Sequence, residues 1–198
     1  MNLAFSEDDM PVRIAFEQPL TDDALMRFSA ANEFLRLERD ANGELIVMPP
    51  AGFGSSNMNV RIARLLDEWA EIDGRGTTTE SSGGYSLPDG SVRAPDSAWI
   101  SFERLRPVSA EARDGFAPVC PELVIEIRSK SDRLKPLQTK MEMWLANGAE
   151  VAWLVEPERR VVEVYRPGDL PEVLHDPSSV QGSGPVAGFE LVMARVWQ

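Results

Sequence analysis

The segment Glu122-Leu-Val-Ile-Glu-Ile-Arg128 decides the fold class. Its continuous apolar run is typical of a strand that is buried on both faces of a sheet. Residues 137–147 then carry apolar side chains at helical spacing and end in an Asn-Gly stop, and residues 151–155 are again apolar throughout. A strand, a helix and a strand in this order predict a right-handed crossover and a parallel strand pair. We therefore expect an α/β fold.

The pattern on the N-terminal side of this segment is that of antiparallel strands. Residues 77–87 and 91–101 predict two strands of one hairpin, joined by the turn Asp89-Gly90. An amphipathic helix over about 60–73 precedes them. The predicted order is thus helix, three strands, helix and two strands around one mixed sheet.

Both ends of the chain extend this core. Thr21 is the expected cap of a helix that runs to about Asn32, and two strands at 34–39 and 44–48 flank a turn at Asn42-Gly43. The C-terminal tail is rich in Pro, Gly and Ser and contains one late strand at 189–192. We expect a single domain over residues 1–198, with a helix and hairpin extension at 1–50, a core at 51–167 and a tail at 168–198.

Composition and charge exclude several classes of protein. The 198 residues are 43% hydrophobic and carry 20 basic against 32 acidic side chains, a net charge of −12, which argues against non-specific adhesion to DNA. One cysteine cannot build a disulfide framework, and no segment approaches the roughly 18 apolar residues that cross a bilayer. We expect a cytoplasmic protein that does not contact membranes.

Carboxylates and cations must carry any catalysis in this chain. The one histidine, His175, lies in the polar tail, and neither a GxGxxG turn nor a Walker loop is present. Histidine bases and multi-histidine zinc sites are therefore not expected.

Two carboxylates in apolar strands form the candidate constellation. Asp96 is the one acid within 91–101, and Glu126 lies between Ile125 and Ile127. Such carboxylates are costly to desolvate unless they bind a cation or accept hydrogen bonds. If their strands are neighbours, Asp96 and Glu126 can hold Mg²⁺ (or Mn²⁺), with water and phosphate completing the shell. The alternative is structural: Glu126 pairs with a buried arginine, and Asp96 begins a turn.

These residues resemble the motif of the PD-(D/E)xK nucleases. Stretches such as "RLERDANGELIVMPP", "FAPVCPELVIEIRSKSD" and "LQTKMEMWLANGAEVAWLVEPERRVVEVYRPG" further resemble the Uma-two family of predicted restriction-endonuclease-like proteins, over nearly the whole chain. The resemblance implies a restriction-endonuclease-like core at 51–167 and Mg²⁺-dependent hydrolysis of DNA phosphodiester bonds. Asp96 and Glu126 are then the metal ligands, and Glu80 is a weaker candidate for a third.

One position departs from the superfamily motif. A lysine is expected two residues after the strand glutamate, but Arg128 stands there, and an arginine effectively never deprotonates. Lys140, on the following helix, is the expected substitute unless it is an ordinary surface lysine. The predicted catalytic set is therefore Asp96, Glu126, Arg128 and Lys140, and the predicted nucleic-acid contacts are Lys130, Arg133 and Lys135.

DNA is the favoured partner, and a homodimer is expected because two-fold symmetry suits cleavage of both strands of a duplex. Two alternatives stay open. The first is a nuclease of the same fold that acts on RNA or on structured ends. The second is a catalytically inactive module that binds nucleic acid or regulates.

Overall fold

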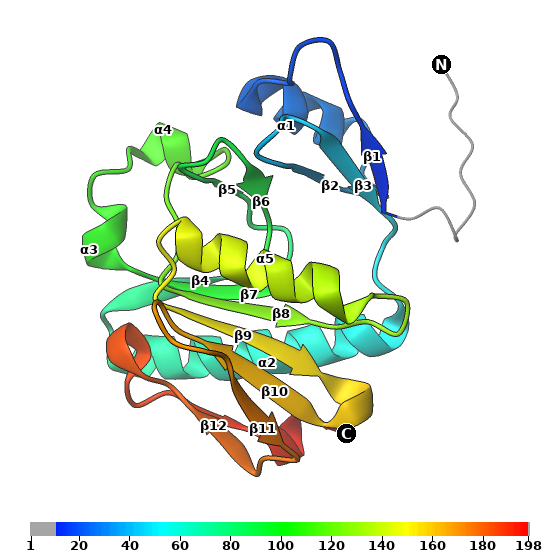
Figure 1. Cartoon of the computed structure of the whole chain (residues 1–198). Helices are drawn as coiled ribbons and strands as arrows, with labels where there is room; N and C mark the ends of the chain where they lie inside the picture. The colour runs from blue at the N-terminus through cyan, green and yellow to red at the C-terminus, as the bar shows by residue number, and fades with distance from the viewer. Residues whose placement is uncertain (1–10, 198) are drawn as a thin grey trace.

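A six-stranded mixed sheet lies at the centre of the computed structural model, which describes residues 11–197 (Figure 1). Its strand order is β11-β10-β9-β8-β7-β4. Strands β8 and β9 are parallel, and the other neighbouring strands are antiparallel. The bounds are β4 Gly76–Glu80, β7 Ser97–Ser101, β8 Leu123–Ile127, β9 Val151–Glu156, β10 Val161–Tyr165 and β11 Glu172–His175.

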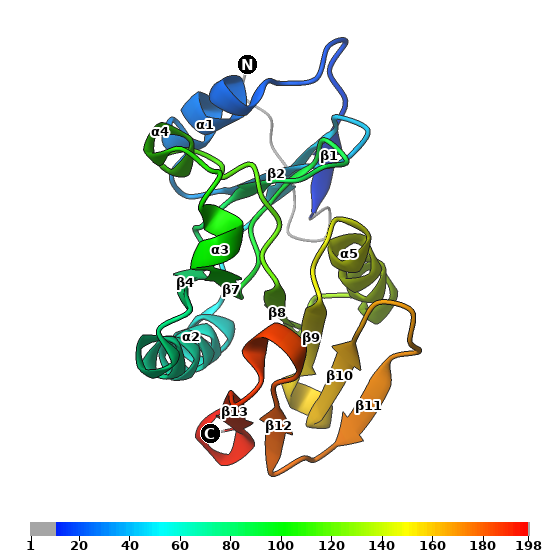
Figure 2. The ribbon, with the colours of Figure 1, turned by 90° about the vertical axis from the view of Figure 1, so that its left-hand side faces the viewer.

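Helices α2 (Phe53–Asp73) and α5 (Leu134–Ala146) cover opposite faces of this sheet (Figures 1 and 2). The side chains of β8 alternate between them: Ile125 packs in the core that α2 covers, and Val124 packs in the core that α5 covers. All five residues of β8 are buried. The predicted doubly buried strand and the parallel crossover through α5 are both confirmed.

A second sheet has the order β1-β3-β2-β6-β5 and is called the N-terminal sheet below. The predicted hairpin β2–β3 is present in this sheet, and helix α1 packs beside it. Thr21 caps α1 as predicted, because its side chain accepts the N–H of Ala24. The helix ends two residues before the expected Asn32. The bounds are β1 Val12–Ile14, α1 Asp22–Ala30, β2 Arg36–Arg39, β3 Leu45–Met48, β5 Tyr85–Ser86 and β6 Val92–Arg93.

The predicted hairpin at 77–101 exists, but its two strands are not continuous. Its base, β4–β7, pairs in the six-stranded sheet, and its tip, β5–β6, pairs in the N-terminal sheet. One break contains Gly84, where a Cβ atom would lie 2.4 Å from the Phe116 ring. The other contains Pro95, which has no N–H to donate to a ladder. One hairpin therefore links the two sheets, and Asp96 lies in the second break.

The C-terminal segment packs against α2 and is part of the main core. Phe189 stacks on Trp153 with ring centroids 5.6 Å apart, and Val180 and Leu191 are buried beside them. The sequence prediction included the strand at 189–192 and missed β1, β11 and β12. The remaining elements are α3 Phe102–Leu105, α4 Ala110–Arg113, β12 Ser179–Gln181, β13 Glu190–Val192 and the short 3₁₀ turns Pro157–Arg159, Gly184–Val186 and Met193–Arg195.

None of the helices between residues 11 and 197 combines the length and hydropathy that a bilayer crossing requires.

Glu38 of β2 connects the N-terminal sheet to α5. Its side chain is 4% exposed and contacts Arg93 Nη1 at 2.8 Å and Lys140 Nζ at 3.2 Å. Burial would raise the pKa of Glu38, but the positive charges of Lys140 and Arg93 outweigh it and lower the pKa to about 2. The Glu38 carboxylate is therefore charged in the folded protein at neutral pH.

Glu38→Gln should make the protein less stable at neutral pH. The folded pKa of about 2 lies below the 4.5 of a free glutamate side chain, so the ion pairs stabilise the fold fully above pH 4.5 and this stabilisation is lost as the pH falls toward 2. The free energy of unfolding of the variant should be lower than that of the wild type by roughly 3 kcal/mol at pH 7. Urea unfolding of the wild type and of Glu38→Gln should show that this difference shrinks between about pH 5 and pH 3. A difference that is constant over this range would contradict the role given to Glu38.

Candidate nuclease site

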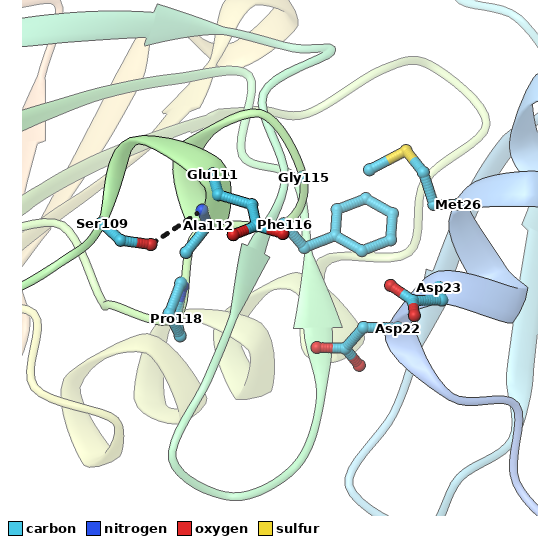
Figure 3. A pocket seen from close by; sticks show the side chains of 9 residues that line it. All are labelled: Asp22, Asp23, Met26, Ser109, Glu111, Ala112, Gly115, Phe116 and Pro118. Carbon is cyan, nitrogen blue, oxygen red and sulfur yellow. Dashed lines mark hydrogen bonds between the residues drawn. The ribbon is translucent and has the colours of Figure 1, made fainter.

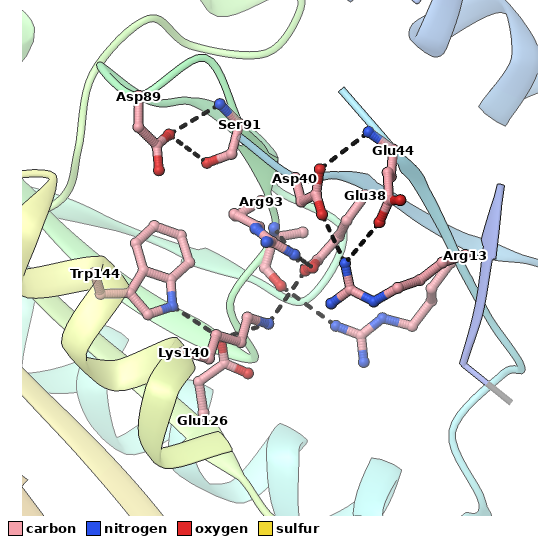
Figure 4. A network of polar contacts seen from close by, with 12 residues as sticks. Arg13, Glu38, Asp40, Glu44, Asp89, Ser91, Arg93, Glu126, Lys140 and Trp144 are labelled. Atoms are coloured by element: carbon pink, nitrogen blue, oxygen red, sulfur yellow. Dashed lines mark hydrogen bonds and ion pairs between the residues drawn. The ribbon is translucent and has the colours of Figure 1, made fainter. Parts of the chain in front are cut away.

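Six charged side chains gather where the two sheets meet α5. Three are carboxylates and three are cations, and they come from β2, β6, β8, α5 and the residue before β7. We call this group the junction cluster, and it consists of Arg36, Glu38, Arg93, Asp96, Glu126 and Lys140. Figure 4 shows Glu38, Arg93, Glu126 and Lys140 directed toward one another.

Asp96 and Glu126 are brought together by strand register. Ser97 pairs with Ile125, so Asp96 lies beside the end of β8, next to Glu126. Asp96 Oδ2 accepts the N–H of Ile127 at 2.8 Å, and its Oδ1 lies 3.4 Å from Arg36 Nη1. The neighbouring strands on which the sequence prediction depended are thus present.

Glu126 is buried against α5. Its Oε1 lies 2.7 Å from Lys140 Nζ and accepts the indole N–H of Trp144 at 3.1 Å (Figure 4). Burial raises the pKa of Glu126 to about 7, against the opposite effect of Lys140, and the negative charges of Asp96 and Glu38 add to the rise. The carboxyl group of Glu126 is therefore harder to ionise than that of an exposed glutamate.

Lys140 lies between two carboxylates and is not a surface lysine. Its side chain is 16% exposed, and its Nζ contacts both Glu126 and Glu38. Burial acts to lower the pKa of Lys140, but these two carboxylates outweigh it and raise the pKa above its ordinary value. The side chain is therefore an ammonium ion that faces the junction cluster.

Arg128 and Glu80 contact other groups. Arg128 Nη1 lies 2.6 Å from Glu156 Oε2, and its Nε donates to the backbone carbonyl of Asp132 at 3.1 Å. Glu80 lies at the end of β4, opposite Ser97, and its carboxylate accepts hydrogen bonds from Ser82. The structure therefore joins Asp96, Glu126 and Lys140, whereas Arg128 and Glu80 have separate partners.

The predicted nucleic-acid residues lie on the exposed segment between β8 and α5 and on the first turn of α5. Lys130 is 87% exposed and makes one ion pair with Glu158 at 3.4 Å. Arg133 and Lys135 are also exposed. All three side chains are accessible to a partner.

Sequence reasoning missed the three cluster residues of the N-terminal sheet, Arg36, Glu38 and Arg93. The alternation in β2 contained a signal, because Leu37 packs against α1 and its two neighbours must therefore face the other way. What that other face meets depends on how the second sheet is placed, and local sequence does not encode this.

The cluster offers two carboxylate oxygens to a cation. Glu126 Oε2 accepts no hydrogen bond from residues 11–197, and Asp96 Oδ1 has only the long contact to Arg36. No group of three or more His, Cys, Asp or Glu side chains in this range is arranged as a metal site. Mg²⁺ usually takes one or two carboxylates together with water and phosphate, so the residues present fit it.

A separate surface pocket of about 410 Å³ lies between α1 and the loop after α4 (Figure 3). Asp22, Asp23, Met26 and Phe116 are among its lining residues, and Asp22 is already paired with Arg39 at 2.7 Å. None of the lining residues belongs to the junction cluster, so we do not place the site in this pocket.

Known proteins resemble this chain both in sequence and in structure. Residues 23–194 match the Uma2 family model, described as "Putative restriction endonuclease". No curated protein matches the sequence. The chain is similar to a crystal structure described as a "putative nuclease belonging to DUF820" from Anabaena variabilis, with a TM-score of 0.68 and 19% identity over 81% of this chain and 89% of that chain. This likeness shows the fold.

A second likeness, to a DrdV–DNA complex solved by cryo-electron microscopy, has a TM-score of 0.37 and 16% identity over 58% of this chain and 9% of that chain. It is too distant to carry an argument. The family match covers most of the chain. The protein therefore belongs to the Uma2 family and has a restriction-endonuclease-like α/β fold.

Proposed function

We propose that the protein is a metal-dependent nuclease that hydrolyses phosphodiester bonds of DNA at the junction cluster. The observation that carries the proposal is the pair Asp96 and Glu126, side by side at the end of β8, with Lys140 against Glu126. Membership of the Uma2 family, described as "Putative restriction endonuclease", supports it. Mg²⁺ or Mn²⁺, when bound, would polarise the phosphate and lower the pKa of a bound water molecule.

The protein holds these groups in place before a substrate arrives. The N–H of Ile127 orients Asp96, and the indole of Trp144 orients Glu126. Because both donors belong to rigid elements, the two carboxylates need little rearrangement. The Lys140 ammonium is placed to offset negative charge as it develops on a phosphate.

An inactive nucleic-acid-binding or regulatory module is the second candidate. It is favoured by the motif position, where Arg128 is tied to the buried Glu156, and by the net charge of −12. RNA and structured ends remain alternative substrates of the same site. The homodimer, the third ligand Glu80, the single domain and the cytoplasmic location stay predictions.

The first experiment combines metal binding with cleavage. Calorimetry should show Mn²⁺ binding that Asp96→Asn and Glu126→Gln each abolish, while Glu142→Gln, an exposed change on α5, leaves it intact. Duplex DNA, single-stranded DNA and RNA should be tested with Mg²⁺, Mn²⁺ and EDTA, and we expect DNA cleavage that EDTA stops. Metal binding without cleavage of any substrate would favour the inactive module.

Lys140 and Arg128 should differ in single-turnover cleavage. Lys140→Ala removes the ammonium that faces Glu126 and should slow cleavage by roughly 10²–10³-fold. Arg128→Lys restores the motif residue and should retain substantial activity. Lys140→Arg tests whether a proton is transferred, because a guanidinium cannot accept one. Full activity of Lys140→Ala would remove Lys140 from the site and leave Arg128 as the motif cation.

DNA affinity should depend steeply on salt through the segment before α5. Replacing Lys130, Arg133 and Lys135 with glutamine should flatten the plot of log affinity against log salt by up to about 3, if each contacts one phosphate. The matched control replaces three exposed arginines elsewhere, Arg27, Arg64 and Arg106. Equal slopes for the two triple variants would place the phosphate contacts on another surface.

A further inference from the structure

The three cations of the junction cluster are held with unequal strength. Arg93 lies 2.8 Å from Glu38, and Lys140 lies 2.7 Å from Glu126. Arg36 is different: its guanidinium lies 3.4 Å from Asp96 Oδ1 and 3.5 Å from the carbonyl oxygen of Ala94. Charged N–H···O bonds usually measure about 2.7–2.9 Å, so both contacts of Arg36 are weak.

Arg36 is also the most accessible of the three. Its side chain is 31% exposed, against 12% for Arg93 and 16% for Lys140. Burial acts to lower the pKa of Arg36, but Asp96, Glu126 and Glu38 outweigh it and raise the pKa. The guanidinium therefore lies in the field of all three carboxylates while part of it reaches solvent.

The cluster contains three carboxyl groups and three cations. A divalent cation at Asp96 and Glu126 would leave an excess of positive charge, and the cation with the weakest contacts is the one most readily released. Arg128 is a poorer candidate for a mobile cation, because Glu156 holds its guanidinium at 2.6 Å. A released guanidinium can bind a phosphate through two parallel hydrogen bonds.

We propose that Arg36 is the residue with which the N-terminal sheet contacts the phosphate backbone of the substrate, and that Asp96 restrains Arg36 until the charge of Asp96 is neutralised. The N-terminal sheet then takes part in substrate binding through Arg36. The inference rests on the proposed function, because that function supplies the cation at Asp96.

The test uses the full chain and needs no cleavage. Asp96→Asn neutralises the restraining carboxylate, so binding of a dye-labelled duplex DNA in EDTA should become tighter. Arg36→Gln should have little effect in the wild-type background, where Asp96 holds the guanidinium, and should weaken binding by about fivefold or more in the Asp96→Asn background. Arg64→Gln, an exposed arginine of α2, is the control in both backgrounds.

Metal binding is an independent measurement, in which Arg36→Gln should raise the affinity and not lower it. Arg36→Gln removes a positive charge beside Asp96, so Mn²⁺ should bind several-fold more tightly in calorimetry. If Arg36 had only a structural role, Arg36→Gln would weaken the binding of both DNA and Mn²⁺ and would lower the melting temperature of the protein.

Additive effects on DNA binding, or unchanged Mn²⁺ affinity in Arg36→Gln, would overturn the assignment while leaving the nuclease proposal intact. Absence of Mn²⁺ binding by the wild type would instead refute the metal site on which both proposals rest. Absence of measurable DNA binding by the wild type and by Asp96→Asn would overturn the role of Arg36 directly.

Discussion

A buried carboxylate must keep a cation beside it or give up its charge, and this constraint governs the centre of the molecule. Glu38 and Glu126 are each about 95% buried, and one ammonium, that of Lys140, serves both. Their environments then act in opposite directions, since the pKa of Glu38 falls to about 2 and that of Glu126 rises to about 7. The same ammonium therefore neighbours one carboxylate that stays ionised at neutral pH and one that is harder to ionise.

The bent hairpin makes this arrangement possible. If residues 91–101 formed one flat strand, Asp96 would lie inside a ladder, and the tip of the hairpin could not turn away from the core to pair in the N-terminal sheet. The break at Pro95 instead places Asp96 between the sheets, where it is reached by Arg36 from one side and by the N–H of Ile127 from the other. A single change of direction thus serves both the architecture and the site.

The parts that the sequence could predict are those that depend on local periodicity. The doubly buried β8 and the crossover through α5 follow from an apolar run, helical spacing and turn signals within about 50 residues, whereas the adjacency of Asp96 and Glu126 is only a condition of the predicted site. The ion pair of Lys140 with Glu38 and the presence of Arg36 and Glu38 in the cluster depend on where a second sheet packs, and a strand of four residues carries no signal of its distant neighbours. The motif position misled in a different way, because Arg128 has the expected spacing but is bound by a glutamate from the next strand.

The separation of Glu38 and Lys140 has a consequence for the order of folding. The two residues are 102 positions apart in the chain, and β6, which supplies Arg93 between them, pairs with β2 across more than fifty residues. Contacts over such distances form late, because the entropy of closing long loops must be overcome before they contribute. During synthesis from the N-terminus, Glu38 has no Lys140 to pair with until α5 has emerged. The charged centre is therefore among the last parts of the molecule to assemble, and a chain interrupted before α5 has no site at all.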